Sequence, residues 1–147
     1  MSDEAKRNVL EEAYANARRR FPDVAEITAE ELLLRWESDD LVVVDVRESF
    51  EQQVSMIPGA ITAKQFEANA AEYQGKTIVP YCTIGGRSGM YSQRLQASGW
   101  AVLNFKGSIL AWTLAGGELH NSEGPTKKVH TNSKKFDLAA DGYEAVW

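Results

Sequence analysis

One stretch, Val79-Pro80-Tyr81-Cys82-Thr83-Ile84-Gly85-Gly86-Arg87-Ser88, contains the only cysteine of this 147-residue chain. Residues 77–81, just before the cysteine, are apolar and rich in β-formers, which predicts a buried strand. Residues 88–97 carry apolar side chains at helical spacing, which predicts a helix. Cys82 is therefore expected on a strand-to-helix turn, at the edge where open α/β sheets bind ligands.

The residues after Cys82 favour chemistry at its sulfur. Gly85 and Gly86 permit positive φ angles, so successive backbone N–H groups can point into one concavity. Together with the positive end of the following helix dipole, such a loop favours the ionised form of a thiol. From residue type alone, however, a lone cysteine is more often a small buried apolar residue kept for packing. The position of Cys82, before two glycines and an arginine, favours the nucleophilic role.

Strand and helix patterns alternate along the rest of the chain. The β-branched run 41–46 predicts a central parallel strand that is buried on both faces. Shorter strands are expected at 26–28, near 61, at 77–81 and at 101–105, and helices at 4–20, 28–36, 65–73, 88–97 and 108–115. Capping boxes are expected at 28–31 and 49–52. This order predicts an α/β fold, with a mostly parallel five-stranded sheet and helices on both faces.

Four motifs, in order, resemble those of the rhodanese (sulfurtransferase) superfamily. Four residues separate Cys82 from Arg87, and Ser88-Gly89 follows, as in the active-site loop of that family. The segments Val43-Val44-Asp45-Val46-Arg47, Ile57-Pro58-Gly59-Ala60-Ile61 and Gly107-Ser108-Ile109-Leu110-Ala111-Trp112 resemble three other family motifs. Two residues depart from the pattern: Met56 stands where the family often has histidine, and Thr83 where thiosulfate-type enzymes often have a basic residue.

The resemblance covers about residues 21–118 and implies a rhodanese-like domain there. Residues 1–20 are then an N-terminal amphipathic helix packed on the domain, and residues 119–147 a C-terminal extension that packs back on it. We expect Trp112 in the core.

The resemblance also implies an activity and a set of site residues. Cys82 would take sulfane sulfur from a donor such as thiosulfate, become a persulfide, and pass the sulfur to a thiophilic acceptor such as cyanide. The loop residues Thr83, Ile84, Gly85, Gly86, Arg87 and Ser88 would bind the anions, with Arg87 holding the donor. Asp45 and Arg47 would support the loop. For Arg47 a second interpretation stays open beside this one, a surface ion pair, for example with Glu51.

Two other functions stay open at this point. A non-catalytic or sulfur-relay module, taking sulfur from one protein and handing it to another, needs the same persulfide. A cysteine phosphatase that shares the rhodanese architecture is less favoured, because its loop is one residue longer than the one here. The partners we expect are a small-molecule sulfur donor and acceptor, or a sulfur-accepting protein.

Composition and spacing argue against other classes. A net charge of −5 argues against nucleic acid as a partner, although Arg18-Arg19-Arg20 forms a local basic patch. His120 and His130, without a second cysteine, lack metal-ligand spacing, and no glycine-rich nucleotide motif is present, so we expect neither metal nor cofactor. No apolar run approaches the ~20 residues of a membrane span. We expect no membrane partner and a cytoplasmic location.

Overall fold

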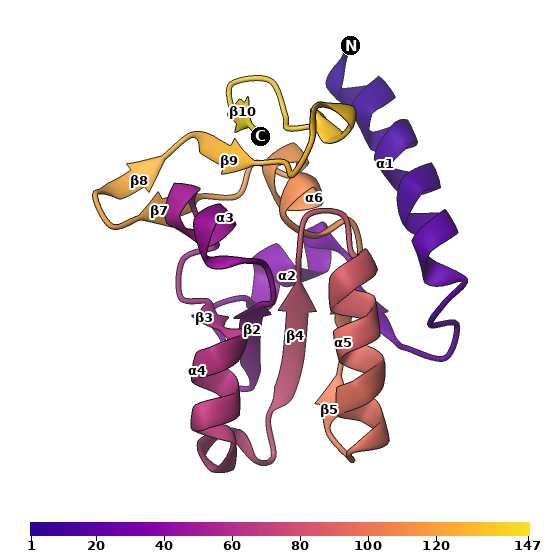
Figure 1. Cartoon of the computed structure of the whole chain (residues 1–147), viewed down its shortest axis with the longest axis vertical. Coiled ribbons are helices and arrows are strands. Elements are labelled where there is room, and N and C mark those ends of the chain that lie inside the picture. The colour runs from indigo at the N-terminus through magenta and orange to yellow at the C-terminus, as the bar shows by residue number, and fades with distance from the viewer.

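The computed structural model describes residues 1–147 and contains a parallel sheet at its centre (Figure 1). Its strand order is β3-β2-β4-β5, where β2 is Leu41–Asp45, β3 Ile61–Thr62, β4 Thr77–Tyr81 and β5 Ala101–Val102. Every residue of β2 is buried, as expected of a central strand with helices on both faces. The prediction of an α/β fold with a mostly parallel sheet is confirmed.

The strand expected at 101–105 is divided in two. After β5, Leu103 still donates its N–H to the Ile78 carbonyl at 2.9 Å, and β6, Asn104–Phe105, then pairs with β1, Glu26–Ile27, at the edge. Pro80 lies two residues beyond Ile78 and so faces the same neighbouring strand. Proline has no N–H to donate, which explains why the ladder with β4 ends here. The predicted five-stranded sheet is therefore corrected to a four-stranded sheet, with β1 and β6 as a separate parallel pair.

Each face of the sheet packs against a different set of helices. On one face, Val42 and Val44 of β2 meet helix α4, Ala63–Ala68, and the end of helix α5, Gly86–Ala97. On the other face, Val43 and Val79 belong to the main core, together with α2, Ala29–Arg35, and α6, Ser108–Leu114. Helix α1, Asp3–Arg18, packs beside α5 and α6 and buries Leu10, Tyr14 and Ala17 (Figure 1).

Several predicted helix ends are wrong. Helix α5 begins at Gly86, two residues earlier than expected, so Arg87 lies in its first turn. Helix α1 ends at Arg18 instead of residue 20, with Arg19 as its C-cap. The helix expected at 65–73 is two elements, α4 and the 3₁₀ helix η1, Ala70–Tyr73. A capping box between Thr62 and Gln65 fixes the earlier start of α4.

The second capping box is also one residue away from its predicted place. Helix α3, Ser49–Val54, has Glu48 as its N-cap, and the Glu51 carboxylate accepts the Glu48 N–H at 2.9 Å. The expected pair was Ser49 with Gln52, so the prediction is corrected to Glu48 with Glu51. The capping box at Thr28 and Glu31, which opens α2, is confirmed.

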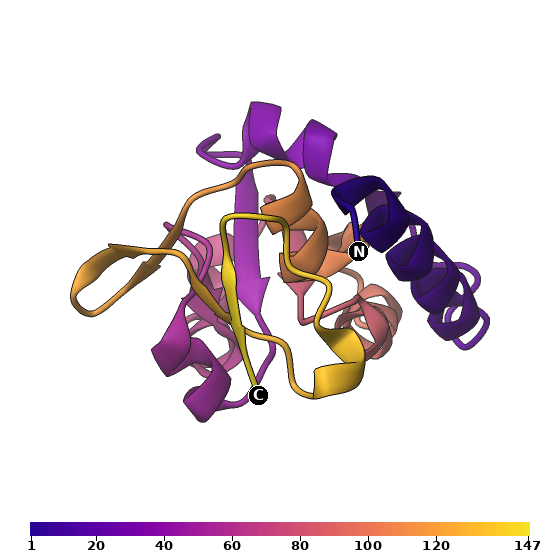
Figure 2. The same ribbon diagram turned by 90° about the horizontal axis from the view of Figure 1, so that it is seen from above.

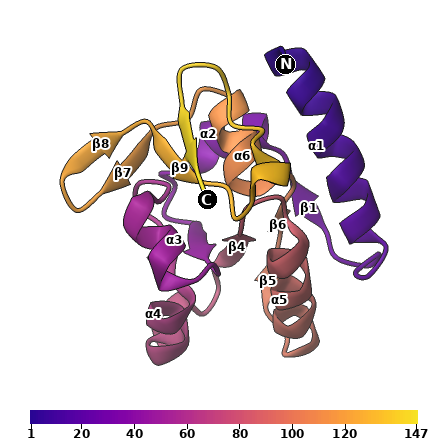
Figure 3. The same cartoon turned by 45° about the horizontal axis from the view of Figure 1, so that its top comes forward.

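The C-terminal residues cross the carboxyl edge of the sheet (Figures 2 and 3). They form an antiparallel pair, β7 Leu119–Asn121 and β8 Gly124–Thr126, then β9 Lys128–His130, the 3₁₀ helix η2 Lys134–Phe136, and β10 Glu144–Val146, which pairs parallel with β9. Val129, Leu138, Ala139 and Ala140 are buried in the main core. Among the helices, none combines the length and the apolar character that a membrane crossing requires.

Candidate active site

Cys82 directly follows β4, and its sulfur is enclosed by the loop that leads into α5. Cys82 is 1% exposed. The Gly85 N–H donates to Sγ at 3.2 Å and the Ser88 N–H at 3.4 Å, while the Ser88 hydroxyl oxygen lies 3.5 Å from Sγ. Backbone N–H groups cannot give up their protons, so both donors stabilise negative charge on the sulfur. The geometry is suited to a nucleophilic thiolate.

The loop conformation depends on glycine at position 85. Gly85 is the N-cap of α5 and has φ = 118°, a value that L-residues with side chains rarely adopt. A Cβ at this position would also lie 2.6 Å from Cε1 of Tyr14 in α1. The Gly85 carbonyl accepts a hydrogen bond from the Asn104 side chain at 3.1 Å, which anchors the turn from β6. Helix α1 and strand β6 thus both hold the loop in place.

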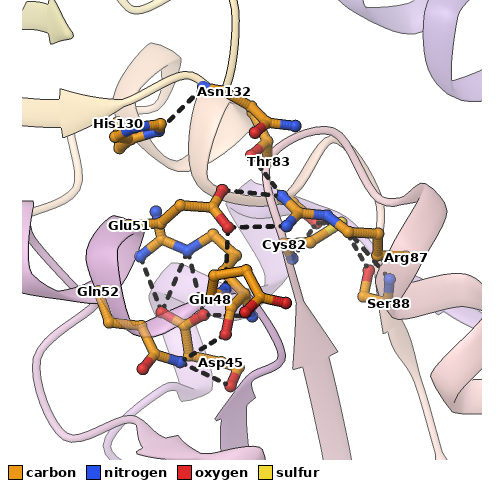
Figure 4. A network of polar contacts seen from close by, with 12 residues as sticks. Asp45, Glu48, Glu51, Gln52, Cys82, Thr83, Arg87, Ser88, His130 and Asn132 are labelled. Atoms are coloured by element: carbon orange, nitrogen blue, oxygen red, sulfur yellow. Dashed lines mark hydrogen bonds and ion pairs between the residues drawn. The ribbon is translucent and has the colours of Figure 1, made fainter. Parts of the chain in front are cut away.

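Arg87 forms a second part of the site, with Glu51 of α3 and Thr83 of the loop (Figure 4). Its guanidinium donates to the two carboxylate oxygens of Glu51 at 2.8 and 3.0 Å and to the Thr83 hydroxyl at 3.0 Å. The Glu51 side chain is fully buried, whereas that of Arg87 is 39% exposed. The alternative of a surface ion pair between Arg47 and Glu51 is wrong, because Glu51 pairs with Arg87 and Arg47 with Asp45.

The contacts of this pair shift the pKa values of both groups. Burial alone would raise the pKa of the Glu51 carboxyl, but hydrogen bonds from Arg87 and the Glu48 N–H, with the charges of Arg87 and Arg47, hold it below its ordinary value. Burial opposes the charge of Arg87, but the Glu51 carboxylate and the nearby Cys82 sulfur raise the pKa of the guanidinium. Glu51 is therefore an anion that neutralises the arginine beside the sulfur.

Asp45 and Arg47 form a buried ion pair below the loop, with both side chains inaccessible to water. Arg47 Nη2 lies 2.8 Å from Asp45 Oδ2 and also donates to the Ser55 carbonyl at 2.7 Å. The Tyr81 hydroxyl donates to the same Asp45 oxygen at 2.6 Å, and it accepts the Ile57 N–H at 3.1 Å. Neither charged residue touches the sulfur. They act on the loop through Tyr81, which is the residue before Cys82 and is hydrogen-bonded to Asp45.

The same buried pair shifts two further pKa values. Burial disfavours the charge of Arg47, but the charge and hydrogen bonds of Asp45, together with the charge of Glu51, raise the pKa of the guanidinium. Burial, followed by the negative charge of Asp45, raises the pKa of Tyr81 far above its ordinary value. Tyr81 is therefore a neutral hydrogen-bond donor over the whole physiological range.

Ser108 is a site residue that the sequence reasoning missed. It begins α6, is fully buried and has φ = 49°, which is unusual for a residue other than glycine. Its hydroxyl oxygen accepts the Cys82 N–H at 3.1 Å, donates to the Phe105 carbonyl at 2.9 Å and lies 4.0 Å from Sγ. The only signal in the sequence was its place after Gly107, in the motif that ends at Trp112.

The C-terminal extension also reaches this side of the molecule (Figure 4). The ring of His130 packs edge-on against Phe50 in α3, with their centroids 5.3 Å apart, and its Nδ1 accepts the Asn132 N–H. His120 lies farther along, where it forms a β-bridge with Met56. Neither histidine is hydrogen-bonded to Cys82, whose polar neighbours are backbone N–H groups and the hydroxyls of Ser88 and Ser108.

The structure brings most of the predicted residues around one sulfur. Gly85 and Ser88 touch Sγ, while Thr83 and Arg87 form the wall toward Glu51. Ile84 instead packs against the main core, and Gly86 opens α5. No group of three or more His, Cys, Asp and Glu side chains is arranged to hold a metal ion.

Fold and site together correspond to a known class of domain. The model of the rhodanese-like domain family matches residues 28–115, more than half of the chain. The chain therefore belongs to the rhodanese-like family, which is of the sulfurtransferase type, and the resemblance seen in the sequence is confirmed.

Individual relatives agree with this assignment. The chain is 33% identical over 98 residues to a sulfurtransferase of Allochromatium vinosum, a match that covers 63% of this chain and 92% of that protein. It is also 33% identical over 84 residues to an uncharacterized protein of Synechocystis sp., covering 54% of this chain and 47% of the relative. Among solved structures, thiosulfate sulfurtransferase from Pseudomonas aeruginosa has a TM-score of 0.62 at 22% identity, over 76% of this chain and 23% of that one. At that identity the likeness is one of fold.

Proposed function

We propose that this protein transfers sulfane sulfur through a persulfide on Cys82. The Cys82 thiolate attacks the outer sulfur of thiosulfate, a new S–S bond to Cys82 forms, and the S–S bond of thiosulfate breaks with release of sulfite. Cyanide, or another thiophilic acceptor, then attacks the outer sulfur of the persulfide, and the Cys82 thiolate leaves. The observation that carries this proposal is the pair of N–H donors, from Gly85 and Ser88, directed at Sγ.

In this proposal Arg87 binds the anionic donor. A guanidinium has five N–H donors, and three contacts go to Glu51 and Thr83. Two N–H groups of Arg87 are left for an anion at the mouth of the loop. Burial of Cys82 to 1% exposure supports a small donor over a protein that presents its own sulfur.

The mass of the intact protein tests the persulfide. Incubation with thiosulfate should add the mass of one sulfur atom, and cyanide or dithiothreitol should remove it. Cys82→Ser should gain no mass and lose turnover, while Ser98→Ala, a change at the far end of α5, should behave like the wild type. A Cys82→Ser variant that still gains a sulfur atom would overturn the proposal. Persulfide formation with only feeble thiosulfate:cyanide turnover would identify a relay instead of a thiosulfate enzyme.

Kinetics of an Arg87 variant test its part in donor binding. Arg87→Ala should lower kcat/KM for thiosulfate. The loss should correspond to about 2 to 3 kcal/mol of activation free energy, the size of a charge-assisted hydrogen bond. Arg87→Lys should restore part of the loss. Arg19→Ala, which removes an exposed charge outside the loop, is the matched control. If kcat/KM is unchanged in Arg87→Ala, Arg87 does not bind the donor, and its role is limited to the ion pair with Glu51.

A further inference from the structure

A surface hollow of about 330 Å³ lies beside the active-site loop, along the exposed side of α5. Gly86 of the loop is part of its wall, and the other lining side chains are Arg20, Val46, Arg87, Met90, Tyr91 and Arg94. Three of them are arginines and none is a carboxylate. In a chain with a net charge of −5, this concentration of positive charge next to the nucleophile points to an anionic ligand.

Arg20 brings uncompensated charge to the loop from outside the family domain. Arg18, in the same basic triplet, pairs with Glu26 at 2.7 Å, but the Arg20 side chain makes no ion pair and no hydrogen bond. Its guanidinium lies against the loop, because a Cβ added to Gly86 would be 3.3 Å from Arg20 Nη2. The residue precedes the segment that matches the family, 28–115, so its charge is an addition made by this chain's N-terminal segment.

Arg94, in the last turn of α5, provides a second positive charge that is not paired with a carboxylate. Its guanidinium lies 5.3 Å from the centre of the Tyr91 ring and has no carboxylate partner. The Tyr91 hydroxyl donates to one carboxylate oxygen of Glu67 in α4 at 2.8 Å, which holds the ring in place. Tyr91 thus forms a rigid support for Arg94.

The spacing of these charges indicates the size of the ligand. Arg94 lies seven positions after Arg87 in α5, so their backbones are about 10 Å apart along the helix axis at ~1.5 Å per residue. Arg87 is neutralised by Glu51, and the surplus positive charge is that of Arg20 and Arg94. Thiosulfate carries its charge directly beside the sulfur and is too small to bridge this row. A molecule that has its sulfur at Cys82 and its anionic groups several bonds away fits the arrangement.

We propose that this hollow, the three-arginine pocket, binds the carboxylate or phosphate groups of a low-molecular-weight thiol that accepts sulfur from Cys82. The proposal rests on the persulfide proposed above. The acceptor thiolate attacks the outer sulfur of the Cys82 persulfide, and an S–S bond forms on the acceptor. The S–S bond to Cys82 breaks, and its electron pair stays on the Cys82 thiolate. The acceptor leaves as a persulfide, and the step needs no external oxidant or reductant.

Binding of sulfur-free anions tests the pocket independently of sulfur transfer. Titration calorimetry with inorganic pyrophosphate and with citrate should show binding that weakens as ionic strength rises. Arg20→Gln and Arg94→Gln should each weaken it by about threefold to tenfold, as expected for partly exposed charges. Arg19→Gln, a neighbouring exposed arginine that does not line the pocket, should leave binding unchanged. Equal weakening in all three variants, or in none, would overturn the proposal.

Two matched pairs of acceptors test the role in transfer. Glutathione and its diethyl ester differ in carboxylate charge, and 4′-phosphopantetheine and pantetheine differ in one phosphate, while the thiol of each pair is the same. The pocket variants should slow transfer to the anionic member of one pair and leave transfer to its partner without those anionic groups, and thiosulfate loading, unchanged; the pair affected identifies carboxylate or phosphate. If Cys82 loads normally but both members of each pair are affected alike, the pocket proposal is wrong. If Cys82 never forms a persulfide, the proposed function itself fails.

Discussion

Glu51 controls how much charge is available beside Cys82. Its fully buried carboxylate holds Arg87 through two hydrogen bonds and compensates the positive charge of the guanidinium. A buried carboxylate without this partner would carry a large desolvation penalty, so the two residues depend on each other. Arg87 can offer directed N–H groups to an anion while the loop keeps its shape. Glu51 is thus a positioning residue for Arg87.

This ion pair makes stability depend on pH in a defined direction. The folded-state pKa of Glu51 lies below its unfolded value of about 4.3. Its pairing therefore contributes stability that is present above that value and is lost as the pH falls through the folded-state pKa. We expect Glu51→Gln to lose about 1 to 3 kcal/mol at neutral pH. Its urea midpoint should also fall less steeply than that of the wild type when the pH drops below about 5.

Urea unfolding at a series of pH values measures this difference. The matched control is Glu12→Gln, which removes an exposed carboxylate that makes no ion pair and should follow the wild-type curve. Parallel curves for Glu51→Gln and the wild type would contradict the prediction, since they would mean that Glu51 protonates equally in both states.

At the scale of elements, the site depends on how closely α5 approaches the turn after α1. Gly89 lies in the first turns of α5, and a Cβ built on it would overlap the ring of Phe21, which is fully buried. Phe21 also packs with Tyr14, the residue that lies against Gly85. The segment before the family domain is therefore packed directly on the helix whose N-terminus surrounds the sulfur.

Gly89→Ala should destabilise the protein by about 1 to 3 kcal/mol, because the added methyl group has no space. Thermal or urea unfolding measures the loss. Gly86→Ala is a comparison in the same helix, where the nearest atom is the flexible end of Arg20 at 3.3 Å, and it should cost less. In a Phe21→Ala background the Gly89→Ala change should cost little, because the overlapping ring is gone. Additive losses in the double variant would show that the ring is not the obstacle.

At the scale of the whole molecule, the C-terminal extension completes the core. Leu138 is 3% exposed and belongs to the main cluster, together with Val129 and the residues of α6. The Thr113 hydroxyl accepts the Ala140 N–H at 3.1 Å, and the Trp112 indole N–H donates to the Glu118 carbonyl at 2.7 Å. Residues beyond the family match thus cover the hydrophobic side of α6, the helix that carries Ser108.

Leu138→Ala should cost about 2 to 5 kcal/mol, the range for a buried leucine that leaves a cavity. The matched control is Leu34→Ala at a side chain that is 89% exposed, which should change stability by less than about 0.5 kcal/mol. Urea unfolding followed by tryptophan fluorescence compares the two, because Trp112 lies in the same core. Equal effects of both substitutions would mean that the extension contributes nothing to folding stability.

The sequence by itself determined the parts of this protein that depend on local pattern. Periodicity located β2, β4 and the helices, and the glycines after Cys82 indicated a loop with donors directed inward, because backbone geometry follows from neighbouring residues. Element ends were less certain, as the start of α5 at Gly86 shows. Gly85 is the N-cap of this helix and Gly86 its first residue, and the spacing of apolar residues does not predict either role.

Only the tertiary structure decided which distant side chains meet at the site. Glu51 reaches Arg87 across 36 residues of chain, Ser108 reaches Cys82 across 26, and Arg20 lies against Gly86 from the turn after α1. Local spacing encodes none of these contacts, because they depend on how α1, α3 and α6 pack around the sheet. The pattern of residues fixed where the sulfur lies. The packing of helices fixed which charges surround it, since a charge acts over distance in space and not along the chain.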